Sequence, residues 1–114
     1  MPVETFPEYD LGNLADRDTA TEDDRAKFEK WRGWKVVYRA NIYTSAVHEL
    51  RSGDVDRAMA VLASVILAWN FVDEEGNPLP QPTRSNFYGL GLPDDLIAAL
   101  MYGFAEVFAN PKAP

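Results

Sequence analysis

The turn at residues 73–77 is the first place to look for chemistry, because three acidic side chains precede Gly76 and Asn77. A calcium-binding loop of the EF-hand type needs an acidic ligand at its first position and a bidentate Glu at its last. With Gly76 at the glycine position of such a loop, Phe71 and Pro82 occupy these two positions. Neither side chain can bind calcium, so we expect a solvated turn and no metal site.

Candidate residues for catalysis are few. His48 is the only histidine, and the chain has no cysteine. Ser45 lies within reach of His48 on a helix, but no elbow motif for a nucleophilic serine surrounds it. The acidic pairs at residues 23–24 and 94–95 are better explained as helix starts, and residues 89–91 lack the third glycine of a phosphate loop. We therefore expect no enzyme activity, no catalytic residue and no cofactor.

The charge is negative overall and unevenly placed. A net charge of −7 argues against a nucleic-acid partner. Residues 25–39 are nonetheless basic, and Trp31, Trp34 and Tyr38 within them have the ring types that stack on single-stranded bases. Their helical spacing favours packing instead. The acidic–basic–acidic layout also permits self-association into a homo-oligomer, and the alternative is neutralisation within the chain.

Apolar residues at helical spacing predict an all-α fold of three to four helices, in a single domain over residues 21–114. The expected helices cover residues 21–32, 34–51, 55–70 and 93–108. Thr21 and Asp24 form a capping-box pattern at the first start, and Asp54 suits the N-cap of the third helix. Gly33 is a poor interior helix residue, so two helices, or one kinked helix, should meet there.

The segments that flank these helices have no apolar period. Residues 1–20 predict an acidic extended arm, which packs either on its own domain or on a neighbour. A Gly- and Pro-rich connector over residues 73–92 precedes the last helix, with a short pairing of residues 71–72 and 78–79 expected at its start. The sequence shows no secretory leader and no apolar run of membrane-spanning length. These features predict a soluble cytoplasmic protein without a membrane partner.

One part of the chain resembles a known family. Trp-Asn at residues 69–70 is followed by the acidic turn at residues 73–77, by Pro-Leu-Pro at residues 78–80, and by Leu-Pro at residues 92–93 before a helix. In this order, after a helix that ends in Trp-Asn or Trp-Asp, the motifs resemble the tail assembly chaperones of long-tailed, siphovirus-like bacteriophages. The resemblance covers about residues 54–108 and does not include the acidic arm.

The resemblance implies a protein without catalysis that acts in the host cytoplasm during phage assembly. Such chaperones bind the tape measure protein, keep its apolar helices from aggregating, and help to recruit tail tube subunits. A helical client would lie in an apolar groove with an acidic rim. The alternative is a minor tail or head protein that stays in the virion and clasps a neighbouring subunit with its acidic arm. The expected partner-binding residues are Trp31, Trp34, Trp69, Asn70, Phe71, Leu100 and Phe104.

Overall fold

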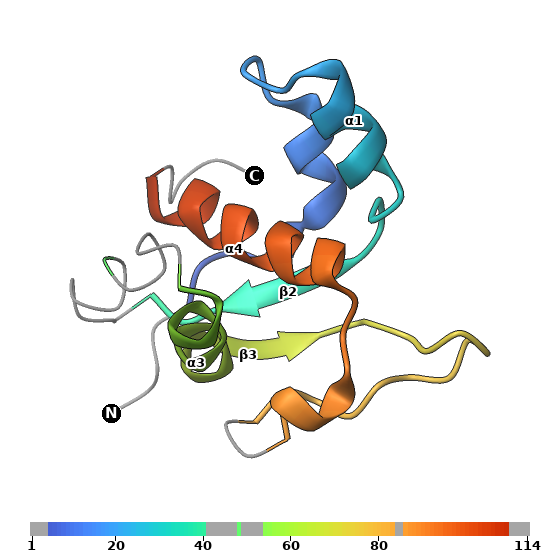
Figure 1. Ribbon diagram of the computed structural model, residues 1–114, viewed down its shortest axis with the longest axis vertical. Helices are drawn as coiled ribbons and strands as arrows, with labels where there is room; N and C mark the ends of the chain where they lie inside the picture. The colour runs from blue at the N-terminus through green and yellow to red at the C-terminus, as the bar shows by residue number, and fades with distance from the viewer. Residues whose placement is uncertain (1–4, 41–47, 49–53, 84–85, 110–114) are drawn as a thin grey trace.

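The computed structural model describes residues 5–40, 48, 54–83 and 86–109, and its fold combines helices with a β-sheet. The all-α prediction is therefore wrong. The elements are β1 (Tyr9–Asp10), the 3-10 helix η1 (Leu11–Asp16), α1 (Glu22–Glu29), β2 (Lys35–Tyr38), α3 (Val55–Val65), β3 (Ile66–Trp69), the 3-10 helix η2 (Tyr88–Leu90) and α4 (Asp94–Ala109). The strands form an antiparallel sheet in the order β1-β2-β3, and α4 lies across it (Figure 1).

Strand β2 replaces the start of the helix expected over residues 34–51. Val36 and Tyr38 are fully buried whereas Lys35 is exposed, which is the alternation of a strand with one covered face. Two adjacent valines favour extended backbone, and β2 pairs with both β1 and β3. The break expected at Gly33 is present, with φ of +87°, but a strand follows it. Residues 41–47 and 49–51 of the expected helix lie outside the described residues.

Strand β3 begins where the helix expected over residues 55–70 ends early. The helix starts as predicted, because the Asp54 carboxylate accepts a hydrogen bond from the Arg57 N–H at 3.2 Å. At Ile66 the backbone becomes extended, with φ of −82° and ψ of 123°, and the chain pairs with β2. No Gly or Pro marks this change, so pairing across the sheet ends the helix. The Trp-Asn pair that ends a helix in the resembled family consequently lies at the end of a strand here, with Trp69 as the last residue of β3.

Residues 5–20 pack on the domain, and a short strand and a 3-10 helix replace the extended form that we expected for this segment. β1 pairs with β2, and η1 packs against α1. Tyr9, Leu11 and Leu14 are buried in the core. Burial, with the Glu106 carboxylate nearby, raises the pKa of Tyr9 to about 12. Of the two placements expected for this segment, packing on its own domain is the one observed.

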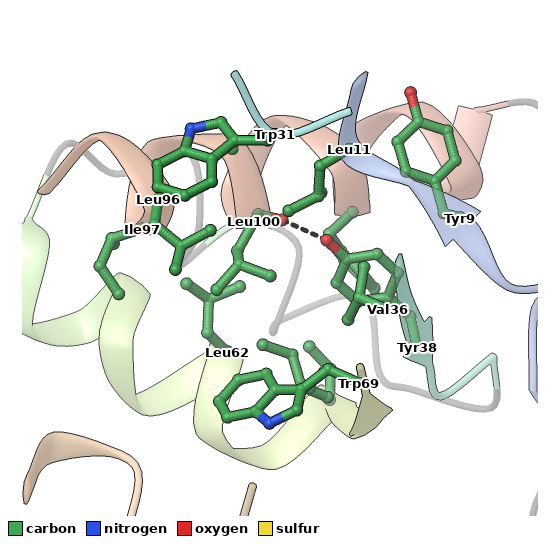
Figure 2. Close-up of a cluster of buried hydrophobic side chains, with 14 of the residues drawn as sticks. Tyr9, Leu11, Trp31, Val36, Tyr38, Leu62, Trp69, Leu96, Ile97 and Leu100 are labelled. Atoms are coloured by element: carbon green, nitrogen blue, oxygen red, sulfur yellow. Dashed lines mark hydrogen bonds between the residues drawn. The ribbon is translucent and has the colours of Figure 1, made fainter. Parts of the chain in front are cut away.

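Helix α4 covers the sheet at close range. Leu100 and Phe104 are buried on its inner face, and the Tyr38 hydroxyl donates a hydrogen bond to the Leu100 carbonyl oxygen at 2.7 Å (Figure 2). Gly103 allows this approach, because a Cβ there would lie 2.8 Å from the Tyr38 Oη and 3.1 Å from the Leu11 Cδ2. Complete burial raises the pKa of Tyr38 well above its usual value.

A side chain covers the outer edge of β3. The Gln81 Nε2 donates to the Trp69 carbonyl oxygen at 3.0 Å, and the Gln81 Oε1 accepts from the Trp69 N–H at 3.1 Å. The indole Nε1 of Trp69 also donates to the Pro80 carbonyl oxygen at 3.1 Å. Trp69 itself is only 6% exposed. The connector is thereby fastened to the end of β3.

Three of the six basic residues at positions 25–39 form ion pairs within the described part of the chain. The ion pairs are those of Arg32 with Asp16 and Glu29, of Lys30 with Asp95, and of Lys35 with Glu8. The Arg32 guanidinium makes two hydrogen bonds to Asp16, which lower the pKa of that carboxyl. These contacts are the intrachain alternative to charge-driven self-association.

Candidate binding groove

A groove with a volume of about 640 Å³ opens between three segments of the chain. Its walls are the turn between α1 and β2, the hairpin that follows β3, and the segment from η2 into α4. The lining residues are Trp31, Trp34, Val72, Asp73, Glu74, Glu75, Leu79, Leu90, Gly91, Leu92, Pro93 and Leu96. We call it the Trp34 groove. Its volume falls in the range of about 300–1,000 Å³ that is usual for ligand sites.

A row of aromatic rings connects the groove to the core. Trp31 meets Trp34 edge to face at 4.9 Å between ring centroids, Trp34 lies 5.1 Å from Phe71, and Phe71 stacks on Trp69 at 4.5 Å. Figure 2 shows Trp31 beside Leu96 of α4, with Trp69 on the other side of the buried cluster. Phe71 and Trp69 thus form a rigid support behind the two tryptophans of the groove.

The turn that carries Trp31 and Trp34 is held by polar contacts. The Asn70 Oδ1 accepts from the Lys35 N–H at 2.7 Å, and the Asn70 Nδ2 donates to the Gly33 carbonyl oxygen at 3.0 Å. Both oxygens of the Asp10 carboxylate accept from the Gly33 N–H. We expected Asn70 to contact a partner, but its side-chain hydrogen bonds hold this wall of the groove in position.

The hairpin after β3 forms the facing wall. The Asp73 Oδ1 accepts from the N–H groups of Glu75 and Asn77, both at 2.9 Å. The pairing expected between residues 71–72 and 78–79 is confirmed by a bridge and by a hydrogen bond of 2.9 Å. A tight, solvent-exposed turn results, in which the Asp73 side chain caps backbone N–H groups.

The rim of the groove is negatively charged. The side chains of Asp73, Glu74 and Glu75 are exposed, and none forms an ion pair with another described residue. On the Trp31 side, the Lys30 ammonium lies 5.2 Å from the indole ring centroid but is paired with Asp95. The uncompensated charge at the groove is therefore acidic.

The predicted partner-binding residues separate into three groups. Only Trp31 and Trp34 line the groove. Trp69 and Phe71 are buried behind them, and Leu100 and Phe104 are buried on the inner face of α4. Asn70 stands apart from these groups, because it does not line the groove. The sequence reasoning missed Leu79, Leu90 and Leu92, which are partly buried and line the groove. In the sequence, these three leucines are marked only by a neighbouring Pro or Gly, in a connector that shows no apolar period.

The lining residues suit binding by apolar contact. They include no hydroxyl, imidazole or amine group. His48 is exposed, and its candidate partner Ser45 lies outside the described residues. In the described ranges, no three acidic or histidine side chains gather as they would around a metal ion. None of the helices described has the length and apolar character that a membrane crossing requires.

Comparison of the chain with protein-family models, with curated proteins and with solved structures gave no match.

Proposed function

We propose that this protein is a tail assembly chaperone of a long-tailed phage, which holds an apolar helical segment of the tape measure protein without performing catalysis. The observation that carries the proposal is the Trp34 groove, which is apolar inside and acidic at its rim. The acidic turn at residues 73–77, Pro-Leu-Pro at residues 78–80 and Leu-Pro at residues 92–93 each contribute lining residues to it. Three of the four motifs that resemble the family therefore line the groove, and the fourth, Trp-Asn at residues 69–70, does not.

The size of the groove supports a particular mode of binding. At about 640 Å³ it accepts a few side chains, while the rest of a client helix stays on the surface. Burial of one large apolar side chain contributes about 1.5–3 kcal/mol. A few such contacts, reduced by the cost of association, give a complex that is able to dissociate when the client is assembled.

The virion alternative depended on an acidic arm that clasps a neighbour. Tyr9, Leu11 and Leu14 of that segment are buried in their own domain, so this support is lost. We retain the alternative only as an outcome of the experiment below.

The test is co-expression with the tape measure protein of the same phage. The protein should raise the soluble fraction of the client and copurify with it. Leu92→Asp, which places a charge in the groove, should abolish both effects while the circular dichroism spectrum is unchanged. Tyr102→Gln is the matched control, because Tyr102 is 50% exposed on α4 and does not line the groove.

Two results would contradict the proposal. One is an equal loss of client binding in the Leu92 and Tyr102 variants, which would show that the client does not bind in the groove. The other is a protein that copurifies with no tail component and occurs at fixed copy number in mature particles. That second result would establish the virion alternative.

A further inference from the structure

Resting on the proposed function, we infer that the Trp34 groove selects client segments in which a Lys or Arg lies about one helical turn from an apolar anchor residue. The acidic rim is the reason. Val72 lines the groove and is followed directly by Asp73, Glu74 and Glu75. Apolar contact and negative charge therefore occur side by side along one wall. Residues about one turn apart on a helix share a face, so such a segment would present both features together.

The charges at the groove favour a ligand that is positively charged. Two hydrogen bonds from backbone N–H groups engage the Asp73 carboxylate, whereas Glu74 and Glu75 are exposed and form no ion pair with a described residue. Lys30, the cation beside Trp31, is already paired with Asp95. An acidic segment would thus meet repulsion, and a neutral one would gain nothing from the rim.

A second copy of this chain is a poor occupant by the same criterion. Three of its basic residues, Arg32, Lys30 and Lys35, are already paired with carboxylates of their own chain. With a net charge of −7, two copies repel one another at long range. The favoured occupant is a basic, apolar segment of a different protein.

The inference is tested with two synthetic peptides of about 14 residues, or about four helical turns. One is an amphipathic helix of Leu and Lys, and the other has Gln in place of every Lys. Because both lack tryptophan, binding is followed by the tryptophan fluorescence of the protein, to which Trp31 and Trp34 in the groove contribute together with the buried Trp69. The Lys peptide should bind about three- to tenfold more tightly, which is the contribution expected of two exposed ion pairs. High salt should remove this difference.

Matched variants assign the effect to the rim. Glu74→Gln combined with Glu75→Gln should make the affinities for the two peptides equal and leave the affinity for the Gln peptide unchanged. Glu22→Gln with Asp23→Asn removes the same charge from exposed residues that do not line the groove, and should preserve the preference. Equal binding of both peptides to the wild type, blocked by Leu92→Asp, would overturn this inference and leave the proposed function standing.

Three other results are decisive. An equal loss of preference in the Glu22 and Asp23 variant would show attraction to overall charge, which overturns the inference. Binding of both peptides that Leu92→Asp leaves intact would place them outside the groove, which also overturns it. Binding of neither peptide to the wild-type protein would overturn both the inference and the proposed function.

Discussion

Two aromatic sites along α4 differ in how completely they are closed. At the sheet, Tyr38 is fully buried, and its hydroxyl is satisfied by the Leu100 carbonyl oxygen. At the Trp34 groove, Trp34 is only partly buried, and the indole Nε1 of Trp31 is buried without a hydrogen-bond partner among the residues that the structure describes. A buried N–H group without a partner carries an energetic cost that the first site avoids. Some aromatic residues of this chain are thus closed off in the core, whereas others form a wall of the Trp34 groove, which opens to solvent.

The largest effect is expected at the sealed end of the aromatic row. Trp69→Ala should reduce the free energy of unfolding by about 3–5 kcal/mol, because it removes a buried ring from between Phe71 and Phe87. Urea denaturation measures this loss. If the loss were below about 1 kcal/mol and client binding disappeared instead, Trp69 would belong to the groove and the division drawn above would be wrong.

Gly103→Ala tests how tightly α4 is seated on the sheet. The new Cβ would lie 2.8 Å from the Tyr38 Oη, and Tyr38 has no room to move. We expect the free energy of unfolding to fall by about 1–3 kcal/mol, although alanine favours a helix. Gly89→Ala is the control, since nothing lies within 4 Å of its added Cβ. A stabilised Gly103 variant would mean that the contact is loose.

Alkaline titration tests the same site without changing its volume. Burial raises the pKa of Tyr9 to about 12 and that of Tyr38 well above its usual value. Because the folded state favours the neutral phenol, the free energy of unfolding keeps its full value below about pH 10. It falls as the pH rises through the folded-state pKa. Near pH 11 we expect a loss on the order of 1 kcal/mol. Tyr9→Phe should flatten the profile of unfolding free energy against pH; an unchanged profile would contradict the assignment.

The groove should give the smallest effect on stability. Leu92→Asp replaces a partly buried side chain just before α4, where a negative charge favours the helix N-terminus. Its free energy of unfolding in urea should change by less than about 1 kcal/mol, whereas client binding is lost. A loss comparable to that of Trp69→Ala would show that the groove is part of the core.

The sequence predicted helix starts better than helix ends. The capping box of Thr21 and Asp24 and the N-cap at Asp54 are both present. Helix α4 lies at Asp94–Ala109, close to the range of 93–108 expected from its apolar face. Each of these starts depends on contacts between residues a few positions apart, which a local pattern is able to specify.

The strands could not be predicted because their stability comes from distant partners. Val36 pairs with Tyr9 on one side and with Trp69 on the other. Trp34 and Tyr38, four residues apart, also fit the apolar face of a helix, and a strand of four residues is too short to override that pattern. The groove was missed in part for the same reason: Leu79, Leu90 and Leu92 come together only through the turns of the connector.

The Gln81 amide has a consequence for the growth of the sheet beyond β3. An uncovered sheet edge offers N–H and C=O groups on which another extended chain can grow. Gln81 supplies the donor and the acceptor that such a chain would bring to Trp69. Another extended chain is therefore kept from adding a strand at this position, and the sheet cannot grow into a fibre from there.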